Sequence, residues 1–378
     1  MRGLIVVTHL LGTGHLSRAL TLARAFTQAG DTVQVLSGGF PAPQLRAEGV
    51  DLRQLPALRS DGVNFTRLLT PEGGPADEDY LARRTDALLA HAKSFNPDIL
   101  ITELFPFGRR ILTAEFEAVL GWAQSSSARP LILSSIRDIL APPSKPEKAA
   151  KADQVIDRYY DGVLVHSDPQ VMLLANSWPV SDRLQPKLHY TGYVAPAAPA
   201  PHPDRAGEGE ILVSAGGGSV GDSLYACAAE AAHLMSNRRW RLLIGGTDAE
   251  SRITQLKTTG TPAILEPARP DFRQMLRHAA ASVSMCGYNT AMDLLQTGIP
   301  SVILPFDAGD EVEQTLRADA LKHLPGFDVI RQGDLTPERL CAAVQQVMAA
   351  PNRPTDGFGF DGAAQAVEIA HQLRKDAS

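Results

Sequence analysis

Short apolar runs alternate along this chain with stretches in which apolar residues recur every three or four positions. Residues 4–8 form the first apolar run, and residues 17–29 follow at helical spacing until Gly30 ends the pattern. Strands that are buried on both faces read as nearly continuous apolar runs, so this alternation predicts a parallel sheet covered by helices on both sides. Further strands are predicted at 32–36, 98–102, 130–134 and 162–166.

The alternation stops at residues 194–203, which read VAPAAPAPHP, and then restarts. Proline at this density does not continue a helix or a central strand. We therefore expect an α/β protein of two doubly wound, Rossmann-like domains that face each other across a cleft, with ligands at the carboxyl ends of the strands. The expected parts are an N-terminal domain at 1–193, a proline-rich linker at 194–209, a C-terminal domain at 210–355, and a helix at 361–378 that is a candidate to pack back on the first domain.

In the second half, strands and helices again alternate. The predicted strands are 210–215, 241–245, 282–285, 300–304 and 327–330, and the predicted helices are 222–235, 289–297, 311–323 and 362–375.

Composition and charge narrow the function classes. The 378 residues are 44% hydrophobic and 21% charged, which is a globular mixture, and the net charge of −6 argues against a nucleic-acid partner. Cys227, Cys286 and Cys341 lie far apart, so the sequence has no zinc or redox motif. We expect a cytoplasmic protein, because no signal-peptide pattern and no apolar stretch of about 18 residues is found.

A glycine-rich stretch, SAGGGSVG at 214–221, lies between a predicted strand and a predicted helix. Glycines let backbone N–H groups approach a phosphate, and a helix N-terminus favours its charge. Three readings stay open: a loop for a sugar-nucleotide diphosphate, a structural turn, or a dinucleotide site. The sequence fits a dinucleotide site poorly. Such sites have an acidic residue at the end of the next strand, and here that strand ends in Gly245 and Gly246.

A second motif, SMCGYNTAMDLL at 284–295, is the most informative. Gly287 allows a close backbone approach, and Asn289 and Thr290 are expected to cap a helix and to point their polar groups one way. Asp293 follows one turn later on the same helix face, where a carboxylate suits a ribose diol. The alternative reading is a capped helix with no ligand.

Glu313 and Gln314 begin the next predicted helix, after a loop that starts at Phe306. Their acceptors and donors suit the hydroxyl groups of a sugar. The alternative reading is a solvated acidic turn.

The letters CGYNT, DLL, GIP, PF, EQ and RA, in this order, resemble the donor-binding region of GT-B glycosyltransferases that use nucleotide-diphosphate sugars. They are similar to the signature region of UDP-sugar glycosyltransferases and of the peptidoglycan N-acetylglucosaminyltransferase. The resemblance implies that Gly287, Asn289 and Thr290 bind the diphosphate and that Asp293 binds the ribose. It also implies that the acidic-Gln pair at 313–314 binds the donor sugar.

One departure concerns the residue before Cys286. The plant enzymes of this kind have a phosphate-binding histidine there, and this chain has Met285. More of the phosphate contact is therefore expected from the glycine-rich stretch. The residues concerned are Ser214, Gly216, Gly217, Gly218 and Ser219.

The resemblance extends to the first half. GTGHLSRALTLARAF is similar to the glycine-rich loop and first helix of the same families, which implies a donor contact at Gly14 and a histidine, His15, that faces the acceptor hydroxyl. PDILITELFPFGRR and RPDFRQML are similar to stretches in a group of bacterial predicted glycosyltransferases, and the resemblance places Arg269 at the border of the nucleobase.

His15 is the candidate general base, because a neutral imidazole at the end of the first strand can take the proton of an attacking hydroxyl. A contact to a phosphate or sugar oxygen and a purely structural role are the alternatives, and His9 in the same loop competes for the role. A carboxylate on the far ring nitrogen would fix the tautomer. Glu103, directly after the strand at 98–102, is the candidate, and its alternative roles are to cap the following turn or to pair with Arg109.

These observations predict an inverting, metal-independent glycosyltransferase of GT-B fold that uses a nucleotide-diphosphate sugar, with a UDP-sugar favoured, and no cofactor. The expected partners are this donor and an acceptor hydroxyl of a lipid, glycan or metabolite, with peripheral contact to the inner face of the membrane as a further candidate. The alternatives are a UDP-sugar hydrolase or 2-epimerase on the same fold, or a non-catalytic nucleotide-sugar or glycan-binding protein.

Overall fold

The computed structural model describes residues 1–10, 12–43, 45, 47–61, 67–216, 220–246, 248–306, 312–351 and 353–377. The chain divides into two compact units. The first consists of Met1–Pro196 and Gly359–Ser378, and the second of Ala197–Phe358.

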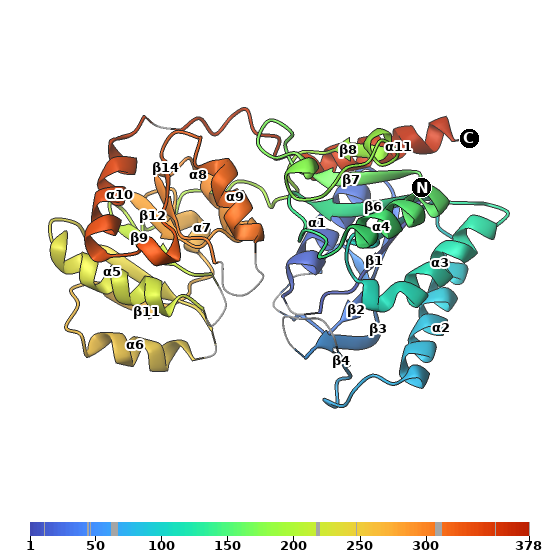
Figure 1. Ribbon diagram of the computed structural model, residues 1–378, viewed down its shortest axis with the longest axis horizontal. Coiled ribbons are helices and arrows are strands. Elements are labelled where there is room, and N and C mark those ends of the chain that lie inside the picture. The colour runs from blue at the N-terminus through green and yellow to red at the C-terminus, as the bar shows by residue number, and fades with distance from the viewer. Residues whose placement is uncertain are drawn as a thin grey trace. The chain divides into compact units, whose positions relative to one another are not determined.

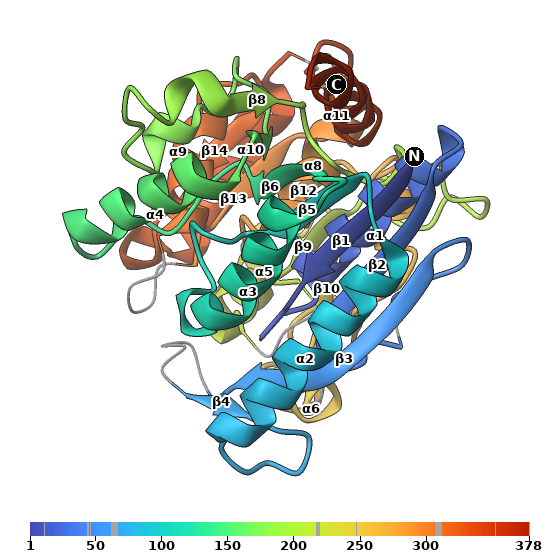
Figure 2. The same ribbon diagram turned by 90° about the vertical axis from the view of Figure 1, so that its right-hand side faces the viewer.

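The first unit is built on an eight-stranded sheet in the order β4-β3-β2-β1-β5-β6-β7-β8 (Figures 1 and 2). All neighbouring strands are parallel except β3 and β4. Its strands are β1 (Arg2–Val7), β2 (Thr32–Gly39), β3 (Asp51–Ser60), β4 (Leu68–Leu69), β5 (Ile99–Glu103), β6 (Leu131–Arg137), β7 (Gly162–His166) and β8 (Leu188–Tyr190). Its helices are α1 (Gly14–Gln28), α2 (Glu78–Phe95), α3 (Thr113–Ser125), α4 (Pro146–Tyr159) and α11 (Gly362–Asp376).

Helices cover both faces of this sheet, as the nearly continuous apolar strands predict. Leu4 and Val6 of β1 face the cluster that includes α2, α3 and α4, and α2 and α3 lie in front of the sheet in Figure 2. Ile5 and Val7 face the opposite cluster, which includes α1 and α11. Alternate side chains of one strand therefore enter two separate cores.

The second unit is built on a parallel six-stranded sheet in the order β11-β10-β9-β12-β13-β14 (Figure 1). Its strands are β9 (Ile211–Ser214), β10 (Trp240–Ile244), β11 (Ile264–Pro267), β12 (Ala281–Ser284), β13 (Ser301–Ile303) and β14 (Phe327–Val329). Its helices are α5 (Asp222–Leu234), α6 (Ala249–Lys257), α7 (Phe272–Met275), α8 (Tyr288–Thr297), α9 (Glu313–Leu321) and α10 (Pro337–Ala349). Side chains of α5 and α10 pack with Trp240 and Val283 in one core cluster.

Four strands are absent from the sequence prediction, namely β3, β4, β8 and β11. β4, β8 and β11 are edge strands with a neighbour on one side only, and β3 lies next to the edge, where β4 pairs with it at Arg59 and Ser60. Their side chains are mixed in burial, and β3 contains a proline at position 56. Edge strands carry a weak hydrophobic signal because only part of each strand enters a core.

Three predicted helix starts are wrong, and one of them is that of α9, which begins at Glu313 and not at residue 311. Helix α1 begins at Gly14, three residues before the predicted start, so His15 is a helical residue. Helix α8 begins at Tyr288 and has Gly287 as its N-cap, so Asn289 and Thr290 lie inside the first turn and are not caps. The reason is that Gly287 already has the extended backbone of an N-cap residue, with φ of −62° and ψ of 153°.

The proline-rich stretch is attached to the two units at its ends. Val194 forms a β-bridge with Asp361, beside α11, and both belong to the first unit. His202 is buried in the second unit, where its ring contacts Asp271 at 3.0 Å and accepts a hydrogen bond from the backbone N–H of Asp204. The division between the units therefore falls at 196/197, and the residues after it are held by specific contacts.

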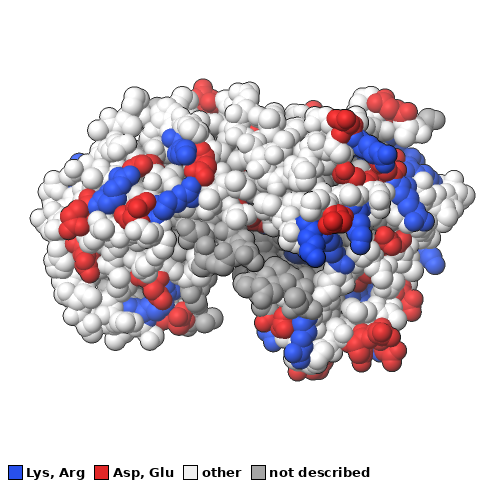
Figure 3. Space-filling model, in the orientation of Figure 1, with Lys and Arg blue, Asp and Glu red and all other residues white. Residues whose placement is uncertain are grey.

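Charges of both signs are interspersed on the face of each unit that Figure 3 draws. This distribution agrees with a chain of small net charge. Among the described residues, no helix is both long enough and apolar enough to cross a membrane.

Candidate active site

In the first unit, the strand order reverses between β1 and β5, which are adjacent and parallel, with Val6 opposite Thr102. The carboxyl ends of two such strands diverge into loops on the same edge of the sheet, which is the usual ligand position of this architecture. Glu103 is the last residue of β5, and His15 lies in the first turn of the helix that follows β1. His15 and Glu103, which are 88 positions apart in the sequence, therefore lie next to each other at this edge of the sheet.

His15 and Glu103 are in direct contact. The Nδ1 of His15 lies 2.8 Å from Oε1 of Glu103, and the same oxygen accepts a hydrogen bond from Nη2 of Arg18. The Glu103 side chain is 1% exposed and that of His15 is 14% exposed. The Nε2 of His15 has no hydrogen-bond partner among the described residues, so the ring presents this nitrogen as its open atom.

The protonation states follow from this environment. Burial, opposed by the contact with Glu103, lowers the pKa of His15 to about 3, so the ring is neutral at physiological pH. Burial alone would raise the pKa of Glu103, but the Arg18 guanidinium and the hydrogen bonds from His15 and Ser135 outweigh it and hold this pKa well below its usual range. A neutral imidazole beside an ionised carboxylate is the arrangement of a general base with its orienting group.

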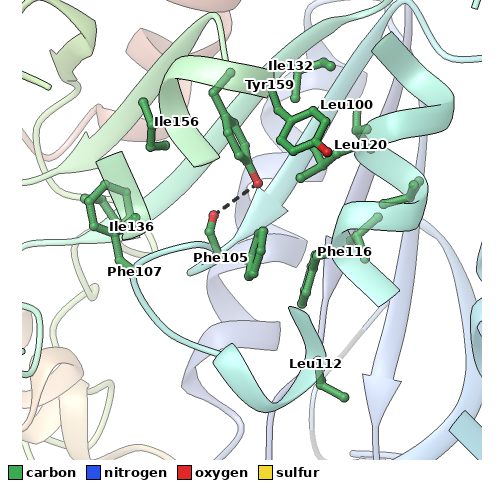
Figure 4. Packing of buried hydrophobic residues seen from close by; sticks show 14 of the residues in the cluster. Leu100, Phe105, Phe107, Leu112, Phe116, Leu120, Ile132, Ile136, Ile156 and Tyr159 are labelled. Carbon is green, nitrogen blue, oxygen red and sulfur yellow. Dashed lines mark hydrogen bonds between the residues drawn. The ribbon is translucent and has the colours of Figure 1, made fainter. Parts of the chain in front are cut away.

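The chain after Glu103 is anchored by two aromatic residues (Figure 4). Phe105 stacks on Phe116, with ring centroids 4.5 Å apart, and Phe107 meets Trp178 edge to face at 5.3 Å. Both rings are buried. Truncating a buried phenylalanine costs about 3–5 kcal/mol, so this loop is held firmly and fixes the end of β5.

A buried guanidinium ties the neighbouring strand ends together. Arg84 of α2 is fully buried and forms an ion pair with Glu115 of α3 at 2.5 Å. It also donates to the hydroxyl of Thr8 at 2.8 Å and to the carbonyl of Gly38 at 2.8 Å. A Cβ at Gly38 would lie 1.9 Å from this guanidinium, so only glycine fits there.

The other histidines of the first half have different surroundings. The Nε2 of His9 contacts the carbonyl of Phe40 at 2.9 Å, the ring is 3% exposed, and burial lowers its pKa. His166 is fully buried, and its two ring nitrogens contact the hydroxyls of Ser135 and Thr191, each at 2.9 Å. Neither ring is as exposed as that of His15.

In the second unit, the strand order reverses between β9 and β12, and Ser214 lies opposite Ser284 at this point. The hydroxyl of Ser214 accepts a hydrogen bond from the N–H of Gly216 at 3.1 Å. Gly216 has φ of +84°, a conformation that favours glycine, so this position has a structural requirement whatever it binds. Gly217, Gly218 and Ser219 lie outside the described residues.

The first turn of α8 starts at the same point of the sheet. Asn289 is exposed, Thr290 is half-buried, and neither side chain has a hydrogen-bond partner among the described residues. Gly287 has negative φ, and a Cβ built there would meet nothing within 4 Å, so neither backbone conformation nor packing requires glycine. The same open space surrounds Gly14 in the first unit.

Asp293 lies on α8 and is mostly buried. Its Oδ1 accepts a hydrogen bond from Nε of Arg273 at 2.5 Å, and the same guanidinium donates to the side chain of Gln296 at 2.8 Å. Burial raises the pKa of Asp293, and Arg273 opposes this effect. The second carboxylate oxygen has no partner among the described residues, so one oxygen is held and the other is open.

Glu313 and Gln314 are the first two residues of α9. The Oε1 of Gln314 accepts hydrogen bonds from the backbone N–H groups of Cys286 at 2.9 Å and Phe306 at 3.1 Å. This side chain therefore bridges the segments that follow β12 and β13. Its amide nitrogen has no partner among the described residues and keeps two hydrogens for donation.

Arg269 is bound within its own loop. Its guanidinium donates to both carboxylate oxygens of Asp271, at 2.8 and 2.6 Å, and lies 3.7 Å from Glu266. These contacts occupy much of its hydrogen-bonding capacity. No three histidine, cysteine or acidic side chains of the described residues gather where they could hold a metal ion.

Sequence reasoning missed several polar residues of these sites, above all Arg18, Ser135, Arg84 and Arg273. Arg18 carries a detectable signal, because it lies among the buried residues of α1 on an otherwise apolar face. Ser135 lies near the end of an apolar strand, where a buried hydroxyl is out of pattern. The partners of these residues come from distant segments, so the pairings themselves leave no local signal.

Comparison with known proteins gives one family match. Residues 212–367 match the glycosyltransferase family 28 C-terminal domain. A curated relative is the UDP-N-acetylglucosamine–N-acetylmuramyl-(pentapeptide) pyrophosphoryl-undecaprenol N-acetylglucosamine transferase of Brucella anthropi, which is 32% identical over 143 residues. This match covers 36% of the present chain and 38% of the relative's length.

Solved structures match over the whole chain. MurG of Acinetobacter baumannii has a TM-score of 0.61 at 15% identity, with 99% of this chain and 100% of that chain covered. UGT2 of Phytolacca americana, solved with UDP-2-fluoro-glucose and pterostilbene, has a TM-score of 0.59 at 15% identity, with 99% and 94% covered. The α/β fold with two parallel-sheet units is thereby confirmed. Residues 212–367 are thus similar to the glycosyltransferase family 28 C-terminal domain, and the chain as a whole has the GT-B fold.

Proposed function

We propose that this chain is an inverting glycosyltransferase that moves a sugar from a nucleotide-diphosphate sugar, with a UDP-sugar favoured, to an acceptor hydroxyl. The observation that carries the proposal is the pair of His15 and Glu103, in which a neutral ring keeps Nε2 open while Nδ1 is held by an ionised carboxylate. The family match of the second unit supports the donor class.

In the proposed reaction, Nε2 of His15 takes the proton of the acceptor hydroxyl as its oxygen attacks the anomeric carbon. The bond from that carbon to the diphosphate oxygen breaks at the same time, and the nucleoside diphosphate leaves with the electron pair. Attack from the face opposite the leaving group inverts the anomeric configuration. Glu103 compensates the positive charge that the imidazole gains.

The second unit would bind the donor. Backbone N–H groups at the start of α8, with Asn289 and Thr290, suit the diphosphate and would stabilise its charge without a metal ion. The open oxygen of Asp293 suits the ribose, and the amide nitrogen of Gln314 suits a sugar hydroxyl. We assign no cofactor beyond this donor substrate.

The acceptor class stays open among lipid, glycan and metabolite. A cytoplasmic enzyme with peripheral contact to the membrane is part of the same proposal. The membrane contact is supported by the curated relative whose name includes pyrophosphoryl-undecaprenol.

The test has two stages. First, thermal unfolding is measured with UDP, dTDP, GDP and ADP, because a ligand at 100 times its Kd adds about 2.7 kcal/mol of stability. We expect UDP to give the largest shift. Second, UDP-sugars are incubated with the enzyme, with and without a pool of phenolic, sugar and lipid acceptors, and released UDP is measured.

A transferase releases UDP mainly when an acceptor is present. Equal release without any acceptor would identify a hydrolase, and conversion of the free UDP-sugar to an epimer would identify an epimerase. Binding of UDP without turnover across all acceptor classes would support a binding protein. No stabilisation by any nucleotide would contradict the proposal.

A further inference from the structure

Glu103 is the centre of a buried chain of polar side chains that runs along the carboxyl ends of β5, β6 and β7. Its Oε2 accepts a hydrogen bond from the hydroxyl of Ser135 at 2.6 Å. That hydroxyl lies 2.9 Å from Nε2 of His166, and Nδ1 of His166 lies 2.9 Å from the hydroxyl of Thr191. Ser135 and His166 are fully buried, so the chain has no contact with solvent between Glu103 and Thr191.

The positions of the hydrogens follow from the charge on Glu103. An ionised carboxylate only accepts hydrogen bonds, so the single hydrogen of Ser135 is donated to Glu103. The oxygen of Ser135 must then accept from Nε2–H of His166. His166 is neutral, because burial lowers its pKa to about 3, so its Nδ1 has no hydrogen and can only accept. The hydroxyl of Thr191 lies 2.9 Å from this Nδ1 and 2.7 Å from the carbonyl of Gly192, so its single hydrogen has more than one acceptor. The hydrogens of Ser135 and His166 then both point toward Glu103.

The same reasoning fixes the other side of the carboxylate. Oε1 of Glu103 accepts from Nδ1–H of His15, and Arg18 donates to the same oxygen. Nη2 of Arg18 also lies 3.1 Å from Nδ1 of His15, to which it could donate only in the reversed tautomer. The reversed tautomer would gain the 3.1 Å contact with Arg18 but would set a nitrogen lone pair against an ionised carboxylate at 2.8 Å, and the shorter contact to the charged oxygen favours the Nδ1–H form. His15 therefore keeps its lone pair on Nε2, where the proposed reaction needs it.

We propose that Ser135 and His166 are positioning residues, which orient the Glu103 carboxylate and thereby hold His15 in the tautomer that carries the free Nε2 lone pair. The inference rests on the proposed function, since only a base at His15 gives this orientation a consequence for turnover. Neither residue contacts the open nitrogen, so each acts only through Glu103.

The first test reads tautomers directly and needs no substrate. Protein labelled with ¹⁵N-histidine is examined at pH 7 by long-range ¹H–¹⁵N correlation spectra, and the two rings are assigned with His15→Ala and His166→Gln. In the wild type we expect His15 in the Nδ1–H form and His166 in the Nε2–H form. The opposite tautomer for either ring would overturn the inference.

Ser135→Ala removes the link, and Ser134→Ala is its matched control. Ser134 is the neighbouring residue of the same strand, is equally buried, and donates to the carbonyl of Phe105 at 2.8 Å instead of to Glu103. We expect mixed tautomers of His15 in Ser135→Ala and the wild-type form in Ser134→Ala. Identical spectra for the two variants would overturn the inference.

His166 is tested by a pair of variants. Gln can present an N–H group near the place of Nε2, whereas Leu has no donor. We expect His166→Gln to keep the His15 tautomer and His166→Leu to behave like Ser135→Ala. Equal behaviour of the two would show that the donor is irrelevant. Circular dichroism melting checks folding, and the wild-type tautomers decide the question if His166→Leu does not fold.

A kinetic arm follows when an acceptor is found. Ser135→Ala should lower kcat on the order of ten-fold, the scale of one hydrogen bond to a charged group, with the donor KM unchanged. A change confined to KM would contradict a positioning role. If the tautomers are as expected and no acceptor supports turnover, the polar chain stands and the transferase assignment fails, so the two failures are distinguishable.

Discussion

In the first unit, both oxygens of Glu103 accept hydrogen bonds from the chain itself, whereas in the second unit Asp293 has one oxygen held by Arg273 and one open. Gln314 shows the same division, since its oxygen bridges two backbone N–H groups and its nitrogen is open. Glu103 ends β5 at the point where the strand order of its sheet reverses. Asp293 and Gln314 lie on the helices that follow β12 and β13, beside the reversal between β9 and β12.

This difference in hydrogen bonding agrees with the two proposed roles, which are to orient a base in the first unit and to bind the donor in the second. A base must be held in one orientation and tautomer before the acceptor arrives, so its orienting carboxylate is fully occupied by protein donors. A donor-binding residue must keep hydrogen-bonding capacity for its ligand, and a partial contact with the chain holds the side chain in place meanwhile. The predictions below test this contrast from the largest expected effect to the smallest.

His15→Ala should lower turnover by about 10²–10⁴, the usual range for a general base, with the affinity for UDP unchanged. Glu103→Gln should cost less, and should add little to the loss in the double variant, because the two residues act as a unit. Steady-state kinetics and UDP calorimetry measure both quantities. If the two losses multiply, the residues act independently, and if His15→Ala stays active, His9 is the next candidate.

Asp293→Asn should weaken UDP binding by about 1.5–3 kcal/mol, because a hydrogen bond to a charged group is lost. The loss should be smaller for dUDP, which lacks the 2′-hydroxyl, and Arg273→Met should weaken UDP binding less than Asp293→Asn does. Calorimetry with both nucleotides measures the affinities. An Asp293→Asn variant with wild-type affinity for UDP would remove this residue from the ribose site.

Stability should fall as the pH drops below about 6.5. The pKa of a histidine is about 6.5 in an unfolded chain, whereas the pKa values of His15 and His166 are both about 3 in the folded chain. Between about pH 3 and 6.5 the unfolded state therefore binds more protons than the folded state. In this range each histidine lowers the free energy of unfolding by up to about 1.4 kcal/mol for every pH unit. Urea unfolding at pH 7, 6 and 5 measures the slope, which should be smaller in His15→Ala and unchanged in Ser134→Ala. Equal slopes in wild type and His15→Ala would refute the lowered pKa of this residue.

Gln314 has two functions that substitutions can separate. Gln314→Ala leaves two backbone N–H groups without their acceptor and should lower stability by about 1–3 kcal/mol. Gln314→Glu keeps an acceptor for both N–H groups and loses the open amide donor. It should therefore melt close to the wild type. Its affinity for a UDP-sugar should be lower than that of the wild type, while its affinity for UDP is unchanged. Melting curves and calorimetry separate these effects, and equal losses for UDP and UDP-sugar would place Gln314 at the nucleotide.

The sequence by itself determined the alternating architecture, because buried parallel strands and amphipathic helices carry local periodic signals. It also determined that His15 and Glu103 follow two strands whose carboxyl ends share an edge, and that CGYNT begins a helix after a strand. It did not reveal the edge strands or the start of α8, where the hydrophobic signal is weak or a glycine takes the cap position.

Only the tertiary structure decided which polar groups meet. Arg18 and Ser135 reach Glu103 from α1 and β6, and Arg273 reaches Asp293 from another helix, over separations of 20 to 85 residues. Hydrogen bonds depend on distances and angles that are set when the elements pack, whereas periodicity is a property of each element alone. The orientation of each candidate side chain is therefore a property of the folded chain.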